Sequence, residues 1–119
     1  MIAELIEKKS GQYIKVTCSE GSISTEQDVL DLVGICGGHR THHVLISEGC
    51  LRAEFLNLRM GLAGVLFQKL ATYQIRAALV GRWDELGSEK FKELMNESNR
   101  GNQVHFFASF SEAEIWLTA

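Results

Sequence analysis

The sequence predicts one α/β domain over residues 1–119, with a mixed, mostly parallel sheet of about five strands, four helices and an N-terminal β-hairpin. Short apolar runs, typical of buried strands, alternate with segments of helical periodicity. The clearest unit runs from the strand at 44–46, through a helix with Gly61 and Gly64, to the strand at 77–80. Such alternation produces parallel strands with helices packed on them. The length is that of a single domain.

The N-terminal half begins with two strands joined by a short turn. Residues 2–7 and 13–18 flank that turn, and the second run alternates apolar and polar side chains, so we expect an antiparallel hairpin. Ser24 and Gln27 have the spacing of a capping box and predict the start of a helix. A Gly-Gly pair ends this helix, and the buried strand at 44–46 follows.

The central helix is predicted to begin near Glu54 and to run to about Gln74, with Tyr73 in its apolar stripe. Gly61 and Gly64 lie three residues apart and therefore on one side of the helix. We expect these glycines to let the helix pack closely against its neighbour.

The C-terminal half repeats the pattern. The strand after the central helix is apolar throughout, as expected of a strand covered on both faces. Ser88 caps the next helix, and the run at 99–101 ends it. Residues 104–108 form the last strand. Ser111 and Glu114 have the spacing of a second capping box and predict the start of the final helix.

This order of elements, with Gly61-Leu62-Ala63-Gly64 in the second helix, resembles the STAS domain of anti-sigma-factor antagonists and anion-transporter tails. The usual STAS signature at this turn is Asp-x-Ser-Gly-Leu-Gly, and its serine accepts a phosphate. Met60 stands in the place of that serine. The resemblance therefore implies the fold, and we expect no phosphorylation switch at this turn.

A second resemblance is closer. The chain is similar over about residues 12–117 to a small bacterial family known only as a domain of unknown function. The similarity rests on the runs at 54–69, 77–82, 97–101 and 104–107. That family has no established catalytic residues, so the resemblance implies no reaction.

Composition excludes several classes of protein. The net charge of −3 argues against a nucleic-acid-binding protein, which needs a cationic face. No apolar run approaches the ~20 residues of a membrane span, and Glu4 and Glu7 interrupt the N-terminus too early for a signal peptide. The three cysteines, Cys18, Cys36 and Cys50, are odd in number and irregularly spaced, which favours reduced thiols in the cytoplasm.

Cysteine and histidine side chains raise the possibility of two kinds of site, a metal centre and a catalytic cysteine–histidine pair. The run 36–43 contains one cysteine and three histidines, residue types that bind zinc or copper. A structural zinc site needs a second pair of ligands, which the sequence lacks, so we predict a solvated loop and no metal. No pattern pairs Cys18 or Cys50 with a histidine base. We therefore predict no enzymatic activity and no cofactor.

Function is predicted at the carboxyl end of the sheet, where open α/β folds place ligands. The candidate residues are Asn57, Arg59, Met60, Arg82, Trp83 and Asp84. Trp83 lies in a polar loop and is the best single candidate for a contact, because Trp and Arg are enriched at interface hot spots.

The favoured hypothesis is a non-enzymatic cytoplasmic interaction or regulatory module that binds a protein partner or forms a homodimer. The alternative is a module that binds a small anionic ligand or a nucleotide at the same end of the sheet. A ligand site would bring Arg59 and Arg82 together at a cavity, whereas a partner surface would expose Met60 and Trp83.

Overall fold

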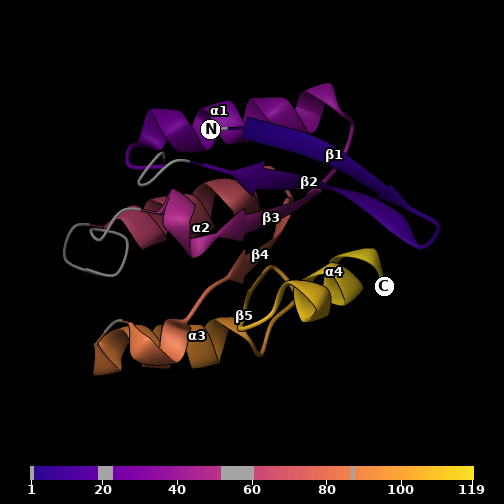
Figure 1. Ribbon diagram of the computed structural model, residues 1–119. Helices are drawn as coiled ribbons and strands as arrows, with labels where there is room; N and C mark the ends of the chain where they lie inside the picture. Colours follow the sequence, from indigo (N-terminus) through magenta and orange to yellow (C-terminus); the bar gives the residue numbers. More distant parts are fainter. Residues whose placement is uncertain (1, 19–22, 52–60, 87) are drawn as a thin grey trace.

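The computed structural model describes residues 2–18, 23–51, 61–86 and 88–119. Its described elements follow the predicted order (Figure 1). They are β1 (Ile2–Lys8), β2 (Gly11–Thr17), α1 (Glu26–Gly38), β3 (His43–Ser47), the 3₁₀ turn η1 (Glu48–Cys50), α2 (Leu62–Thr72), β4 (Arg76–Val80), the 3₁₀ turn η4 (Trp83–Glu85), α3 (Glu89–Ser98), β5 (Val104–Phe107) and α4 (Phe110–Thr118).

The strands form one sheet in the order β1-β2-β3-β4-β5. β1 and β2 make the predicted antiparallel hairpin, with Ile2 opposite Thr17. The remaining neighbours are parallel, so Val44 of β3 lies beside Ile14 on one side and Ala77 on the other. The mixed, mostly parallel α/β fold is therefore confirmed.

Helices cover the sheet unequally. α1, α2 and α3 share one large apolar cluster with one face of the sheet, whereas α4 packs alone on the other face. Right-handed connections that all step in the same direction place their helices on the same face, which explains this division. In Figure 1, α1, α2 and α3 follow one another down the view in chain order, and α4 stands apart from them near the C-terminus. Both faces of the central strands are consequently buried.

The start of α1 differs from the prediction by one residue. Thr25 is the N-cap in an extended conformation, and its side chain accepts from the backbone N–H of Asp28 at 3.2 Å. The Asp28 carboxylate in turn accepts from the backbone N–H groups of Ser24 and Thr25, at 2.9 and 3.0 Å. Asp28 therefore completes the capping box in place of Gln27.

The start of α4 was also misplaced. Ser109, again extended, is the N-cap and accepts from the backbone N–H of Glu112. The N-cap therefore lies two residues before the predicted cap at Ser111, and the helix begins at Phe110. The predicted cap of α3 at Ser88 is confirmed, since its hydroxyl accepts from the backbone N–H of Phe91.

The end of α3 is tied to β5 by side chains as well as by backbone. The Ser98 hydroxyl donates to the carbonyl of Val104 at 2.6 Å, and the Asn99 side-chain oxygen accepts from the backbone N–H of Phe106 at 2.7 Å. The predicted helix stop at 99–101 is confirmed. These two bonds also give the Ser-Asn pair a structural role that accounts for its place in the sequence.

α2 is shorter than predicted and its glycines act differently. The helix begins at Leu62, after Gly61 as N-cap with φ 77°, and residues 54–60 lie outside the described part of the chain. Tyr73 is 48% exposed rather than part of the apolar stripe. A Cβ added at Gly64 would meet no atom within 4 Å, so the expectation that this glycine permits close packing is wrong. Gly61 instead supplies a left-handed conformation at the helix start.

Candidate functional site

The carboxyl edge of the sheet is the predicted functional region. We use this name for η1, which follows β3, and for the Gly81–Glu85 turn, which follows β4. One ion pair joins these segments, since Arg82 Nε lies 3.0 Å from Glu48 Oε1. A second pair lies within the turn, where Arg82 Nη1 is 3.7 Å from Glu85 Oε2. The backbone N–H of Arg82 also donates to Glu48 Oε1 at 3.2 Å. One carboxylate therefore holds both the backbone and the side chain of Arg82.

Gly81 makes this arrangement possible. A Cβ added at Gly81 would lie 2.7 Å from the Cβ of Glu48, closer than real side chains approach. The glycine thus lets the Glu48 side chain lie over the end of β4, where it can reach Arg82. From the sequence we expected a packing role for Gly61 and Gly64 and missed the one that Gly81 has.

The charges of this edge are mostly negative. Glu48 and Glu85 place two carboxylates beside the guanidinium of Arg82, and Asp84 adds a third acidic residue to the same turn. The Glu48 carboxylate beside it, together with Glu85, raises the pKa of Arg82 above its ordinary value. The Arg82 side chain is nevertheless 72% exposed, so it is available to a partner. An incoming anion would meet the carboxylates as well as the arginine.

The prediction for Trp83 is wrong, because this residue belongs to the core. Trp83 is only 6% exposed, and its indole N–H donates to the carbonyl of Leu79 at 3.0 Å. Its ring packs edge-on to Phe106, with centroids 5.0 Å apart, and also meets Phe91 at 6.2 Å. The 3₁₀ turn η4 directs the side chain back under the sheet while leaving its polar neighbours outside. The polar flanks had suggested exposure.

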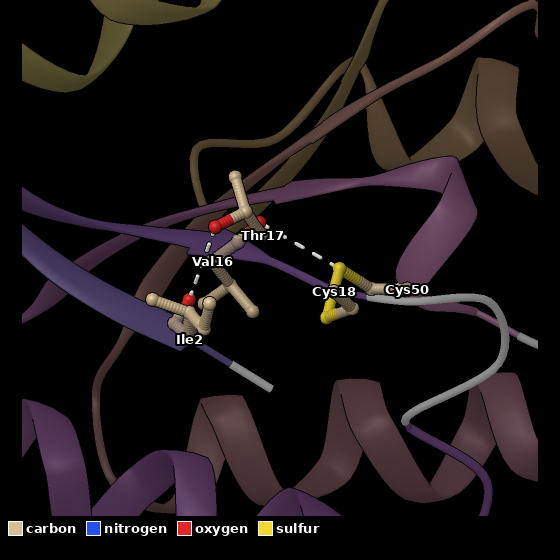
Figure 2. The surroundings of a disulfide bond; sticks show 5 residues. All are labelled: Ile2, Val16, Thr17, Cys18 and Cys50. Atoms are coloured by element: carbon tan, nitrogen blue, oxygen red, sulfur yellow. Dashed lines mark hydrogen bonds between the residues drawn. A yellow bond between two sulfur atoms is a disulfide. The ribbon is translucent and has the colours of Figure 1, made fainter.

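The expectation of reduced thiols is also wrong for two of the three cysteines. Cys18, just after β2, and Cys50, in η1, form a disulfide with a Cα–Cα distance of 5.1 Å. Figure 2 shows the bond at the end of β2, with Cys50 Sγ directed toward the carbonyl oxygen of Val16. β2 and β3 are parallel neighbours, so the residues after their carboxyl ends meet despite a separation of 32 residues. Cys36 is free and buried.

The remaining candidates divide into two groups. Asn57, Arg59 and Met60 lie outside the described residues. Asp84 is exposed and follows Trp83 in the turn. The structure therefore places three of the six candidates, Arg82, Trp83 and Asp84, on the carboxyl edge, with the side chain of Trp83 buried. It adds Glu48, for which the sequence offered only its position directly after a strand.

The carboxyl edge contains a small hollow between η4 and α3. Its volume is about 140 Å³, and its lining includes Gly81, Trp83, Asp84 and Asn99. Small-molecule sites are usually ~300–1,000 Å³, so this hollow is too small for a nucleotide. Arg82 does not line it. This hollow therefore gives no support to a nucleotide site at the edge.

The cysteine–histidine run at 36–43 divides between two environments. Cys36 is in the buried stripe of α1, whereas His42 is exposed before β3. No group of three or more His, Cys, Asp or Glu side chains in the described ranges could hold a metal ion. The ring of His105, in β5, stacks on Trp116 of α4 with ring centroids 4.8 Å apart.

Comparisons with known proteins give one match. A family model described as "Domain of unknown function (DUF4180)" matches residues 8–117, nearly the whole chain. No curated protein and no solved structure matches the chain. No helix in the described ranges is long and apolar enough to cross a membrane.

Proposed function

We propose, from the premise that this chain belongs to the DUF4180 family, that it is a non-enzymatic interaction or regulatory module which binds a protein partner at its carboxyl edge. The observation that carries the proposal is Arg82, whose exposed side chain is held in place by Glu48 and Glu85. Arginine is enriched at interface hot spots. A side chain already fixed before binding loses less conformational freedom when a partner arrives.

The charge of the edge indicates the chemistry of the partner. The described part of the edge carries three acidic residues and one arginine, so it favours a partner that presents basic side chains together with one acceptor for Arg82. The alternative, a small anion or nucleotide bound at this end, is less well supported. Arg82 is already neutralised by Glu48, and the nearby hollow is small.

The proposal also includes a STAS-like class for the domain and a location in the cell. The alternation of strands and helices is consistent with a STAS-like domain, a class that works through protein partners. We retain the cytoplasm as the proposed location. In a reducing compartment, disulfides are usually transient and respond to oxidants. The bond between Cys18 and Cys50, beside the proposed interface, would then form and break with redox state.

Affinity capture from a lysate of the source cells tests the proposal. The bait is the wild-type chain, with Arg82→Ala as the test variant and Arg100→Ala as the matched control. Arg100 is another exposed arginine, and it lies in the turn after α3. We expect specific partners, identified by mass spectrometry, to be lost with Arg82→Ala, retained with Arg100→Ala and released by high salt. Sedimentation velocity on the same three proteins tests a homodimer. Equal capture and equal self-association of all three would exclude this edge as the interface.

A further inference from the structure

A larger cavity lies at the opposite edge of the sheet, before the starts of β3 and β4. It is formed where α1 and α2 end, and its volume is about 370 Å³. This volume is within the range of small-molecule sites. The residues that line it are Val33, Cys36, Gly37, Arg40, Thr41, His42, Tyr73 and Ile75. The cavity is separate from the carboxyl edge and contributes nothing to the interface proposed there.

The two helices that form the cavity end in the same hydrogen-bond pattern. After α1, the backbone N–H of Arg40 donates to the carbonyl of Gly37, and that of Thr41 donates to the carbonyl of Cys36. After α2, the N–H of Gln74 donates to Ala71, and that of Ile75 donates to Leu70. Both patterns are Schellman motifs, which place one residue in the left-handed conformation.

That residue is normally glycine, but here it is Arg40 with φ 55° and Gln74 with φ 56°. They are the non-glycine residues with positive φ in the described part of the chain. A side chain in this conformation costs stability relative to glycine. Strained positions of this kind cluster at ligand sites. Arg40, a lining residue, thus occupies a position where glycine would fold better.

The cavity has an apolar floor and one cationic side chain, that of Arg40, at its exposed rim. Val33, Cys36 and Ile75 supply an apolar floor, of which Cys36 and Ile75 are almost fully buried. Arg40 and His42 are exposed, and no acidic residue lines the cavity. Unlike Arg82, Arg40 forms no ion pair with a described acidic residue.

We propose that this cavity binds a small apolar carboxylate, aliphatic or aromatic. The guanidinium of Arg40 would receive the carboxylate in a bidentate pair, for which its planar fork is suited. The apolar part of the ligand would lie on Val33, Cys36 and Ile75, beside the ring of Tyr73. The carbonyls of Cys36 and Gly37 in α1, and of Leu70 and Ala71 in α2, already accept hydrogen bonds, so these four do not oppose the anion at close range. Arg40 must offset the negative ends of the two helix dipoles.

The test is an NMR titration of ¹⁵N-labelled protein with phenylacetate and octanoate, and with their neutral counterparts 2-phenylethanol and octanol. We expect saturable shifts in residues 36–42 and 73–75 for a carboxylate, with at least tenfold weaker binding of the matching alcohol. Arg40→Gly should abolish this preference. Gln74→Gly is the matched control, because it relieves the same backbone conformation without removing a charge. It should retain full affinity, and both variants should melt at a higher temperature than the wild type.

Three results would overturn the proposal. One is the absence of saturable binding for both carboxylates. Another is equal affinity for acid and alcohol, which would make the cavity merely apolar. The third is undiminished carboxylate binding in Arg40→Gly. Because both glycine variants are expected to fold well, a loss of binding in Arg40→Gly alone cannot be attributed to unfolding.

Discussion

Replacing Trp83 by phenylalanine tests the placement of this residue in the core. The substitution removes the indole N–H, leaving the buried carbonyl of Leu79 without the bond that it now accepts at 3.0 Å. Loss of such a bond costs about 1–1.5 kcal/mol. The smaller ring also buries less apolar surface and loses contact with Phe106, which adds roughly 1 kcal/mol. We therefore expect Trp83→Phe to lower the free energy of unfolding by about 2–3 kcal/mol.

Trp83→Ala should cost more, about 3–5 kcal/mol, because it also leaves a cavity among the rings of Phe91 and Phe106. That loss is a large part of the ~5–15 kcal/mol that stabilises a typical domain, so the phenylalanine variant is the safer measurement. Ile115→Ala serves as the control, since Ile115 is 69% exposed on α4 and its truncation should change stability by less than about 0.5 kcal/mol.

Urea unfolding followed by circular dichroism measures these differences. The fluorescence of Trp116, which remains in both Trp83 variants, provides a second probe of the same transition. A Trp83→Phe midpoint equal to that of the wild type would refute the reasoning. It would mean that the indole is solvated in solution, and Trp83 would again be a candidate contact residue.

Three other predictions concern the cysteines and glycines. Reducing the bond between Cys18 and Cys50 should lower stability by about 3.5–4 kcal/mol, from the chain entropy of a 32-residue separation, and equal urea midpoints with and without reductant would contradict this. Gly81→Ala should destabilise the fold by about 1–3 kcal/mol, because the added Cβ clashes with Glu48. Gly64→Ala, in open space within a helix, should instead stabilise the fold by about 0.5–1 kcal/mol. A lower melting temperature for Gly64→Ala than for Gly81→Ala would contradict both assignments. Burial raises the pKa of the Cys36 thiol from 9.0 to about 11, so the unfolded chain ionises first and stability should fall between pH 9 and pH 11. The loss should be on the order of 2 kcal/mol relative to Cys36→Ala, and parallel pH profiles of the two proteins would disprove it.

The fold was predictable from the sequence because its signals are local. Alternation in β2 and helical spacing in α1 are each visible within a few residues. The helix caps were harder to place, because several Ser, Thr, Asp and Glu residues lie close together. Thr25 and Asp28 competed with Ser24 and Gln27, and only the backbone conformation decides between them. Errors of one or two residues at helix ends are the expected consequence.

The site was less predictable because it depends on contacts distant in the chain. Trp83 is buried by rings from α3 and β5, which no local pattern around η4 reveals. The disulfide depends on β2 and β3 being parallel neighbours in one register. The cavity before the starts of β3 and β4 forms only where the ends of α1 and α2 meet. The left-handed conformations of Arg40 and Gln74 are not indicated by their residue types. These features require the assembled sheet.

The consecutive order of the strands has a consequence for how the chain folds. Each strand adds to an edge that the preceding strand has already formed, and none must insert between two others. One face of this sheet depends on α4 for its cover. Until α4 docks, the apolar patch formed by Tyr13, Leu45 and Ala78 faces water. A folding intermediate that lacks this helix would therefore be prone to aggregate through that face of the sheet.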